Sequence, residues 1–206
     1  MLKFIRLAAY GLIALLVAGV GGALWWRGEA PRLSDIGMAM PGGVSVGGPF
    51  TLVNGAGETV TDASFRGRWM LVYFGYTFCP DVCPTDLQTI SAAMDRLGPL
   101  AQRLVPVFIT VDPERDTPAA LAEYTKLFDE RLVGLSGSKE QIAAAAKSYR
   151  VYYARTKSKH ASDYLMDHSS FIYLVGPDGG FRALFRHGMA VQELADAVKA
   201  RLESGS

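Results

Sequence analysis

Two continuous apolar runs constrain the fold of this chain more than any other feature of its sequence. Residues 69–74 read WMLVYF and residues 104–111 read LVPVFITV. Neither run alternates with polar residues, so each predicts a strand that is buried on both faces, as in a sheet covered by helices. Residues 87–97 lie between the runs and space their apolar side chains helically. The three segments therefore predict a strand–helix–strand unit.

The remainder of the chain after residue 48 continues this alternation. Thr117 followed by Pro118 is typical of a helix start, and Ser138 with Gln141 three residues later is typical of a capping box. We expect further strands at residues 50–53, 132–135, 171–175 and 181–185, and further helices at residues 117–128, 142–149 and 191–202. This order predicts an α/β fold, specifically a thioredoxin-like mixed sheet flanked by helices.

The N-terminus carries an uncharged apolar stretch at residues 7–26. Its length of about 20 residues is what a helix needs to cross the hydrocarbon core of a bilayer. Lys3 and Arg6 precede the stretch, and the positive-inside rule therefore predicts a cytoplasmic N-terminus and an exported remainder. A cleaved signal peptide is the alternative, and it also places the domain outside the cytoplasm.

These features divide the chain into three parts. We expect a membrane anchor with a transmembrane helix at residues 1–27, a Gly- and Pro-rich flexible linker at 28–48, and one folded domain at 49–206. The expected location is the inner (cytoplasmic) membrane as a single-pass protein, with the domain in the periplasm, or in the intermembrane space of an organelle. The whole chain has 21 basic and 20 acidic residues, a balance that argues against nucleic acid as a partner.

The only two cysteines of the sequence, Cys79 and Cys83, lie in one segment between the first buried strand and the helix that follows it. At a spacing of four residues in near-helical backbone their sulfur atoms lie on one face, where they can bind one metal ion or be oxidised to a disulfide. A purely structural disulfide would close too short a loop to stabilise the fold much. Two thiolates are soft ligands that suit Cu(I).

A nitrogen ligand would complete such a site, and the sequence has three histidines. His168 directly precedes a predicted strand, in a segment that we expect to be a loop and that an α/β sheet can bring beside the cysteines. His160 lies in a polar stretch and is expected to be a solvated surface residue. His187 follows the last predicted strand and is expected to be structural or exposed to solvent.

Three segments taken together resemble the Sco/SenC family of copper-binding, thioredoxin-like proteins. They are FRGRWMLVYFGYTFCPDVCP at residues 65–84, VDPERDTP at 111–118 and DHSSFIYLVGPDG at 167–179. The resemblance implies that Cys79, Cys83 and His168 bind copper as Cu(I) or Cu(II). It also implies a metallochaperone that assists assembly of the CuA centre in subunit II of cytochrome c oxidase and receives its copper from an upstream donor.

Two acidic residues and one charged segment within these motifs have weaker assignments. Asp167 can orient its neighbour His168 or can be a solvated loop residue. Asp81 lies between the cysteines and is expected to favour the helix start rather than to bind metal. Residues 112–116 follow a strand end and are expected to form a structured loop near the site, with no catalytic role.

An enzymatic function is the main alternative. In it, Cys79 and Cys83 are redox-active, and the protein is a membrane-tethered thiol-disulfide reductase that keeps the CuA-site cysteines reduced. A copper-dependent redox sensor or thiol peroxidase has less support. The two leading hypotheses differ at His168, because copper binding needs an imidazole whereas dithiol exchange does not.

Overall fold

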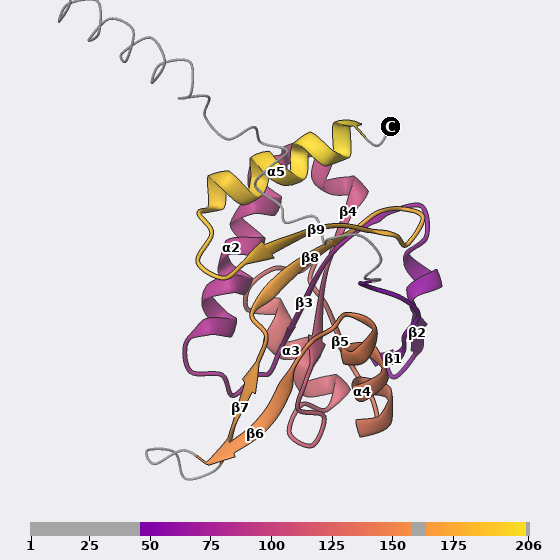
Figure 1. Cartoon of the computed structure of the whole chain (residues 1–206), viewed down its shortest axis with the longest axis vertical. Helices are drawn as coiled ribbons and strands as arrows, with labels where there is room; N and C mark the ends of the chain where they lie inside the picture. The colour runs from indigo at the N-terminus through magenta and orange to yellow at the C-terminus, as the bar shows by residue number, and fades with distance from the viewer. Residues whose placement is uncertain (1–45, 158–163, 205–206) are drawn as a thin grey trace, which may run out of the picture. The chain divides into compact units, whose positions relative to one another are not determined.

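The central sheet of the domain has seven strands in the order β2-β1-β5-β4-β3-β8-β9. The computed structural model describes residues 46–157 and 164–204, all of which belong to one compact unit (Figure 1). Strands β3, β4 and β5 are parallel, and the strands on either side of them run antiparallel to their neighbours. The strands are β1 (Thr51–Asn54), β2 (Thr59–Thr61), β3 (Trp69–Gly75), β4 (Leu104–Thr110), β5 (Val133–Ser136), β8 (Phe171–Val175) and β9 (Phe181–Arg186).

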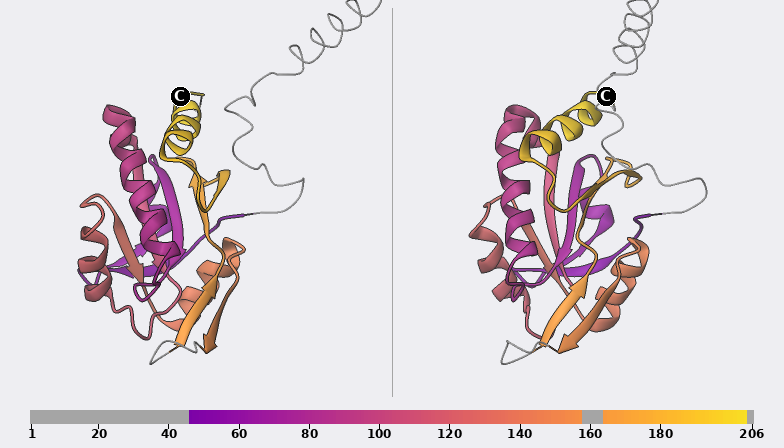
Figure 2. Two further views of the ribbon diagram at one scale, coloured as in Figure 1. Left: turned by 90° about the vertical axis from the view of Figure 1, so that its left-hand side faces the viewer. Right: turned by 60° about the vertical axis from the view of Figure 1, so that its left-hand side comes forward.

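Helices cover both faces of this sheet. Helices α2 and α3 lie on one face, with α5 beside α2, and α4 lies on the other face (Figure 2). Their bounds are α2 (Val82–Leu97), α3 (Pro118–Lys126), α4 (Lys139–Ser148) and α5 (Val191–Ser204). Short 3-10 helices at Asp62–Phe65 and Gly98–Arg103 precede β3 and β4. The fold is therefore the predicted thioredoxin-like α/β arrangement.

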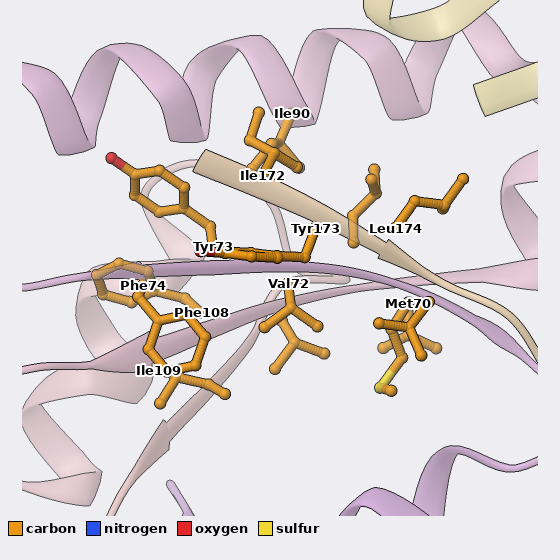
Figure 3. Close-up of a cluster of buried hydrophobic side chains, with 14 of the residues drawn as sticks. Met70, Val72, Tyr73, Phe74, Ile90, Phe108, Ile109, Ile172, Tyr173 and Leu174 are labelled. Atoms are coloured by element: carbon orange, nitrogen blue, oxygen red, sulfur yellow. The ribbon is translucent and has the colours of Figure 1, made fainter. Parts of the chain in front are cut away.

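The two apolar runs form the centre of the core. Every residue of β3 and of β4 is buried, as the absence of polar alternation predicts. Buried side chains lie on both sides of the sheet, with Ile90 of α2 and Ile172 of β8 on one side and Val72 and Met70 of β3 on the other (Figure 3). A domain built this way has a rigid centre, on whose edge a functional site can be held.

A separate two-stranded antiparallel ribbon accompanies the sheet. It consists of β6 (Tyr153–Lys157) and β7 (Tyr164–His168), and it is not hydrogen-bonded to the main sheet (Figure 1). The sequence pattern does not predict these strands, because the segment from Tyr153 to His168 is mostly polar and few side chains of the two strands are buried. His168 is consequently the last residue of a strand, and the expectation of a loop at this position was wrong.

Helix boundaries agree with the expected caps. The Thr117 side chain accepts a hydrogen bond from the Ala120 amide, and the Ser138–Gln141 capping box is present. Helix α2 begins at Val82, five residues before the predicted start, and this places Cys83 in its first turn.

The predicted anchor at residues 7–26 lies outside the described residues. Among the residues that the structure describes, no helix has the length and hydropathy to cross a membrane.

Candidate metal centre

Three segments meet at one edge of the sheet because of strand direction. Parallel strands β3 and β4 end there, and antiparallel β8 begins there, with Ile172 paired to Tyr73 near the end of β3. The cysteine-containing loop follows β3, whereas His168 lies just before β8. The topology thus brings together residues that are 85 positions apart in the chain.

The cysteines occupy the turn into helix α2. Both are free thiols in the structure; Cys83 is fully buried and Cys79 is partly exposed. The Cys83 amide donates a hydrogen bond to Cys79 Sγ over 3.4 Å. The Cys79 sulfur therefore accepts from the first turn of the helix, whereas the N-cap residue Asp81 makes no capping hydrogen bond through its own side chain.

His168 faces the sulfur atoms from the ribbon. Its Nε2 lies 3.3 Å from Cys83 Sγ, and its Nδ1 lies 3.2 Å from the Ser169 carbonyl oxygen. A carbonyl can only accept, so this contact assigns a proton to Nδ1, and Nε2 is the ring nitrogen that faces the cysteines. The rings of Tyr73 and Tyr76 pack edge-on against the imidazole, with centroids 6.2 and 5.9 Å away.

The two sulfur atoms and the imidazole nitrogen form one compact group. The candidate ligand atoms of Cys79, Cys83 and His168 all lie within 4.8 Å of one another. The structure thus assembles the set predicted from the sequence, while its role as a ligand set stays a prediction. A hollow of about 430 Å³ opens beside the group and reaches both Cys79 and His168. A metal ion or another protein can approach from this side.

The two cysteines differ in how readily they lose a proton. The Cys83 thiol donates a hydrogen bond to Cys79 and lowers the pKa of Cys79 to about 3, with further contributions from His168 and the helix amides. The same hydrogen bond, together with burial, raises the pKa of Cys83 far above its usual value. The reduced pair at neutral pH is therefore one thiolate, on the accessible sulfur, and one buried thiol.

This asymmetry predicts how the pair reacts with an alkylating agent. Because the pKa of Cys79 lies near 3, its thiolate is already formed at mildly acidic pH. Its rate with iodoacetamide should be nearly constant from about pH 5 to 8, whereas an ordinary thiol with a pKa of about 8.5 slows roughly tenfold per pH unit. Mass spectrometry of the modified peptide gives the rate at each sulfur. Cys83→Ala, which removes the hydrogen-bond donor, should restore a pH-dependent rate; equal pH dependence in both proteins would contradict the shared proton.

Gly75, the last residue of β3, is a site residue that no sequence pattern indicates. A Cβ atom at this position would lie 2.8 Å from Cys83 Sγ and 2.8 Å from Phe108 Cε2. Both neighbours are fully buried and have little room to move. The absence of a side chain at residue 75 therefore allows the sulfur to approach the end of the strand.

We expect Gly75→Ala to displace the Cys83 sulfur. Overpacking at a buried position costs about 1–3 kcal/mol, so thermal unfolding should occur at lower temperature. Copper binding, measured by competition with a chelator, should weaken as well because one sulfur has moved. Unchanged stability together with unchanged copper affinity would contradict the close packing.

The remaining candidates lie away from the group or at its margin. Asp167 is exposed, and the Nδ1 contact of His168 is to the Ser169 carbonyl. His187 Nδ1 lies 2.8 Å from Oδ1 of the buried Asp86 and is not part of the candidate ligand group. His160 lies outside the described residues. Asp86 was not singled out from the sequence, because an acid in a helical pattern is typical of a solvated face.

The fold and the site define a class of protein, a thioredoxin-like domain that presents two cysteines and a histidine suited to a soft metal ion. The SCO1/SenC family model matches residues 38–203. The chain therefore belongs to the SCO1/SenC family.

Individual relatives agree with this placement. The mitochondrial protein SCO1 homolog of Homo sapiens is 41% identical over 159 residues, covering 76% of this chain and 53% of that protein, so the chain matches about half of its length. The structure of Arabidopsis thaliana ScoI with copper bound superposes with a TM-score of 0.74 at 43% identity, covering 77% of this chain and 99% of that chain.

A second solved structure of the family is also similar to this chain. BsSco, a member of the Sco family of cytochrome c oxidase assembly proteins in which a disulfide switch is identified, superposes with a TM-score of 0.58 at 25% identity. The alignment covers 79% of this chain and 98% of that chain. Copper binding and thiol chemistry are thus both associated with proteins of this fold.

Proposed function

We propose that this protein binds copper through Cys79, Cys83 and His168 and acts in the assembly of cytochrome c oxidase. The observation that carries the proposal is the compact group of two sulfur atoms and one imidazole nitrogen within 4.8 Å. Two thiolates suit Cu(I), and the imidazole makes the site tolerant of Cu(II). Copper bound to the related ScoI and the assembly role stated for BsSco support the proposal.

More specifically, we propose that the protein is a metallochaperone that assists assembly of the CuA centre in subunit II of cytochrome c oxidase. Cys79 is partly exposed and lines the hollow, so a ligand from a partner protein can reach the metal from that side. Cys83 is fully buried and has to lose its proton when it binds the ion, because the thiolate is the metal ligand. An upstream donor has to supply the copper.

The proposed location rests on the N-terminal sequence. We propose that residues 1–27 anchor the chain in the inner membrane, residues 28–48 form a tether, and residues 49–206 form the copper-binding domain on the outer side. The apolar stretch at residues 7–26 supports the anchor. The near-neutral charge of the chain supports a protein partner rather than nucleic acid.

Thiol-disulfide reduction is a second candidate, which the thiolate at Cys79 favours. In this reaction Cys79 attacks a disulfide of the client, forms a mixed disulfide and releases one client thiolate. Cys83 then loses its proton and attacks the Cys79 sulfur, which forms the Cys79–Cys83 disulfide and releases the second client thiolate. The client gains the two electrons that the cysteine pair loses.

The test is copper loading of the full chain after reduction, under anaerobic conditions. We expect one copper ion per chain and, after oxidation to Cu(II), an absorption band from thiolate-to-copper charge transfer. The Cys79→Ser, Cys83→Ser and His168→Ala variants are measured in parallel. Equal copper content in all four proteins would exclude this site as the copper-binding site.

A further inference from the structure

The loop after β4, residues 111–117, contacts both halves of the candidate metal centre. It leaves the sheet beside the cysteine loop, and the Val111 amide donates a hydrogen bond to the Gly75 carbonyl over 2.7 Å. The loop contains four charged side chains between residues 112 and 116, and the proposed function uses none of them. Their contacts show what they do.

Asp116 holds the cysteine loop. Its side chain is completely buried and accepts hydrogen bonds from the Thr77 amide at 3.0 Å, from Thr77 Oγ1 at 2.5 Å and from Thr110 Oγ1 at 2.6 Å. Its own carbonyl oxygen accepts from Ser136 Oγ at 2.7 Å. A buried carboxylate with these partners fixes the backbone two residues before Cys79.

Asp112 and Arg115 hold the ribbon. Asp112 is almost fully buried and accepts from Arg115 Nε at 2.5 Å and from the Tyr164 hydroxyl at 2.8 Å. Arg115 Nη1 donates to the Tyr164 carbonyl oxygen over 3.0 Å. Tyr164 is the first residue of β7, the strand that ends at His168. Two side chains of the loop thus bind one residue of the strand through its hydroxyl and its backbone.

Cation–π contacts reinforce this attachment. The guanidinium groups of Arg115 and Arg155 each lie 3.8 Å from the centroid of the Tyr164 ring. Arg155 belongs to β6, the other strand of the ribbon, and it pairs with Glu114 of the loop. Both strands of the ribbon are therefore connected to the same loop.

The ribbon needs such an attachment. It is a two-stranded sheet of its own, and in β6 and β7 Met166 is the one residue that is buried. An isolated two-stranded ribbon is marginally stable in water, so its position depends on the side chains that bind it. The imidazole at its end lies 3.3 Å from Cys83 Sγ only while the ribbon stays in place.

We propose that residues 111–117 form a clamp that holds the β6–β7 ribbon closed over the cysteine pair, with Arg115 as a positioning residue that acts on His168 through Tyr164. The proposal rests on the proposed function, since the imidazole is taken as a copper ligand. Breaking the Arg115 contacts lets the ribbon move outward and removes the nitrogen from the site. The clamp thereby controls how firmly copper is retained.

The test is a double-mutant cycle on copper affinity with Arg115→Gln and His168→Ala in the full chain. Loss of a group that orients a metal ligand typically lowers affinity by roughly 10–100-fold, and we expect Arg115→Gln to fall in this range. Arg115 also contacts the cysteine loop, since its guanidinium lies 4.6 Å from the centroid of the Phe78 ring. The clamp acts through Tyr164 and the histidine, so the double variant should bind no more weakly than His168→Ala alone. Effects that multiply would overturn the clamp.

A second measurement needs no copper. Hydrogen exchange of the metal-free protein should show faster exchange at residues 165–168 in Arg115→Gln, with unchanged exchange in β3. Tyr164→Phe, which keeps the ring between the guanidinium groups and loses the hydroxyl, should have a smaller effect of the same kind. Arg182→Gln is the matched control, since Arg182 pairs with Asp178 in the β8–β9 hairpin.

The outcomes separate the two proposals. Unchanged exchange at residues 165–168 in Arg115→Gln overturns the clamp whether or not the protein binds copper. Faster exchange in protein that binds no copper, or whose copper affinity is insensitive to His168→Ala, keeps the clamp as a feature of the fold and overturns the assigned ligand set.

Discussion

Replacing Cys83 with serine is expected to abolish both copper retention and disulfide reduction. For copper the variant loses one of two thiolates, and the loss of affinity should exceed the roughly 10–100-fold typical for removal of an orienting group alone. For reduction it loses the sulfur that resolves the mixed disulfide. Copper content after dialysis against a chelator and the reduction rate of a disulfide peptide measure the two effects.

The control for this variant has to separate chemistry from folding. Cys83 is fully buried, so a hydroxyl without a partner there can cost about 1–3 kcal/mol of stability. Cys79→Ser changes the partly exposed partner and should unfold close to the wild-type temperature while losing both activities. A Cys83→Ser protein that keeps either activity at wild-type level would contradict the role of the buried sulfur.

His168→Ala is expected to separate the two functions. Copper binding needs the imidazole nitrogen, so the charge-transfer band of the Cu(II) form should disappear. The copper affinity should fall by roughly 10–100-fold or more. Reduction of a disulfide peptide should stay within about a factor of three, because the hydrogen bond from Cys83 is the largest contribution to the low pKa of Cys79.

The matched control is Asp167→Asn, one residue away. Asp167 is exposed, and the Nδ1 contact of His168 is to the carbonyl oxygen of Ser169, so this variant should keep the copper affinity of the wild type. If His168→Ala keeps full copper affinity, the imidazole is not a ligand. If His168→Ala loses reduction as completely as copper, thiol exchange depends on the histidine and the two functions cannot be separated here.

The core of the fold follows from local sequence patterns. The apolar runs at residues 69–74 and 104–111 became fully buried strands, and the caps at Thr117 and Ser138 start helices as predicted. These features depend on neighbouring residues only, so periodicity and capping chemistry are sufficient to find them. The β6–β7 ribbon was missed because few of its side chains are buried and its position depends on contacts with distant residues.

The site residues divide in the same way. Cys79, Cys83 and His168 are rare residue types in informative segments, so the sequence could nominate them. Gly75 is a common residue type in an unremarkable position, and Arg115 lies in a loop that the sequence placed near the site without giving it a role. The importance of both residues depends on which side chains are packed against them. Gly75 matters because Cys83 Sγ lies where its Cβ would be, and no local pattern contains that distance.

What the sequence by itself determined is the chemistry available: two soft sulfur ligands four residues apart, one well-placed imidazole, and an alternation of strands and helices to hold them. What only the tertiary structure decided is their relation in space. Antiparallel β8 starts at the edge where parallel β3 ends, and so the imidazole meets the sulfur atoms. The hydrogen bond that the Cys83 thiol donates to Cys79, together with the burial of Cys83, then keeps the proton on the buried sulfur and the charge on the accessible one.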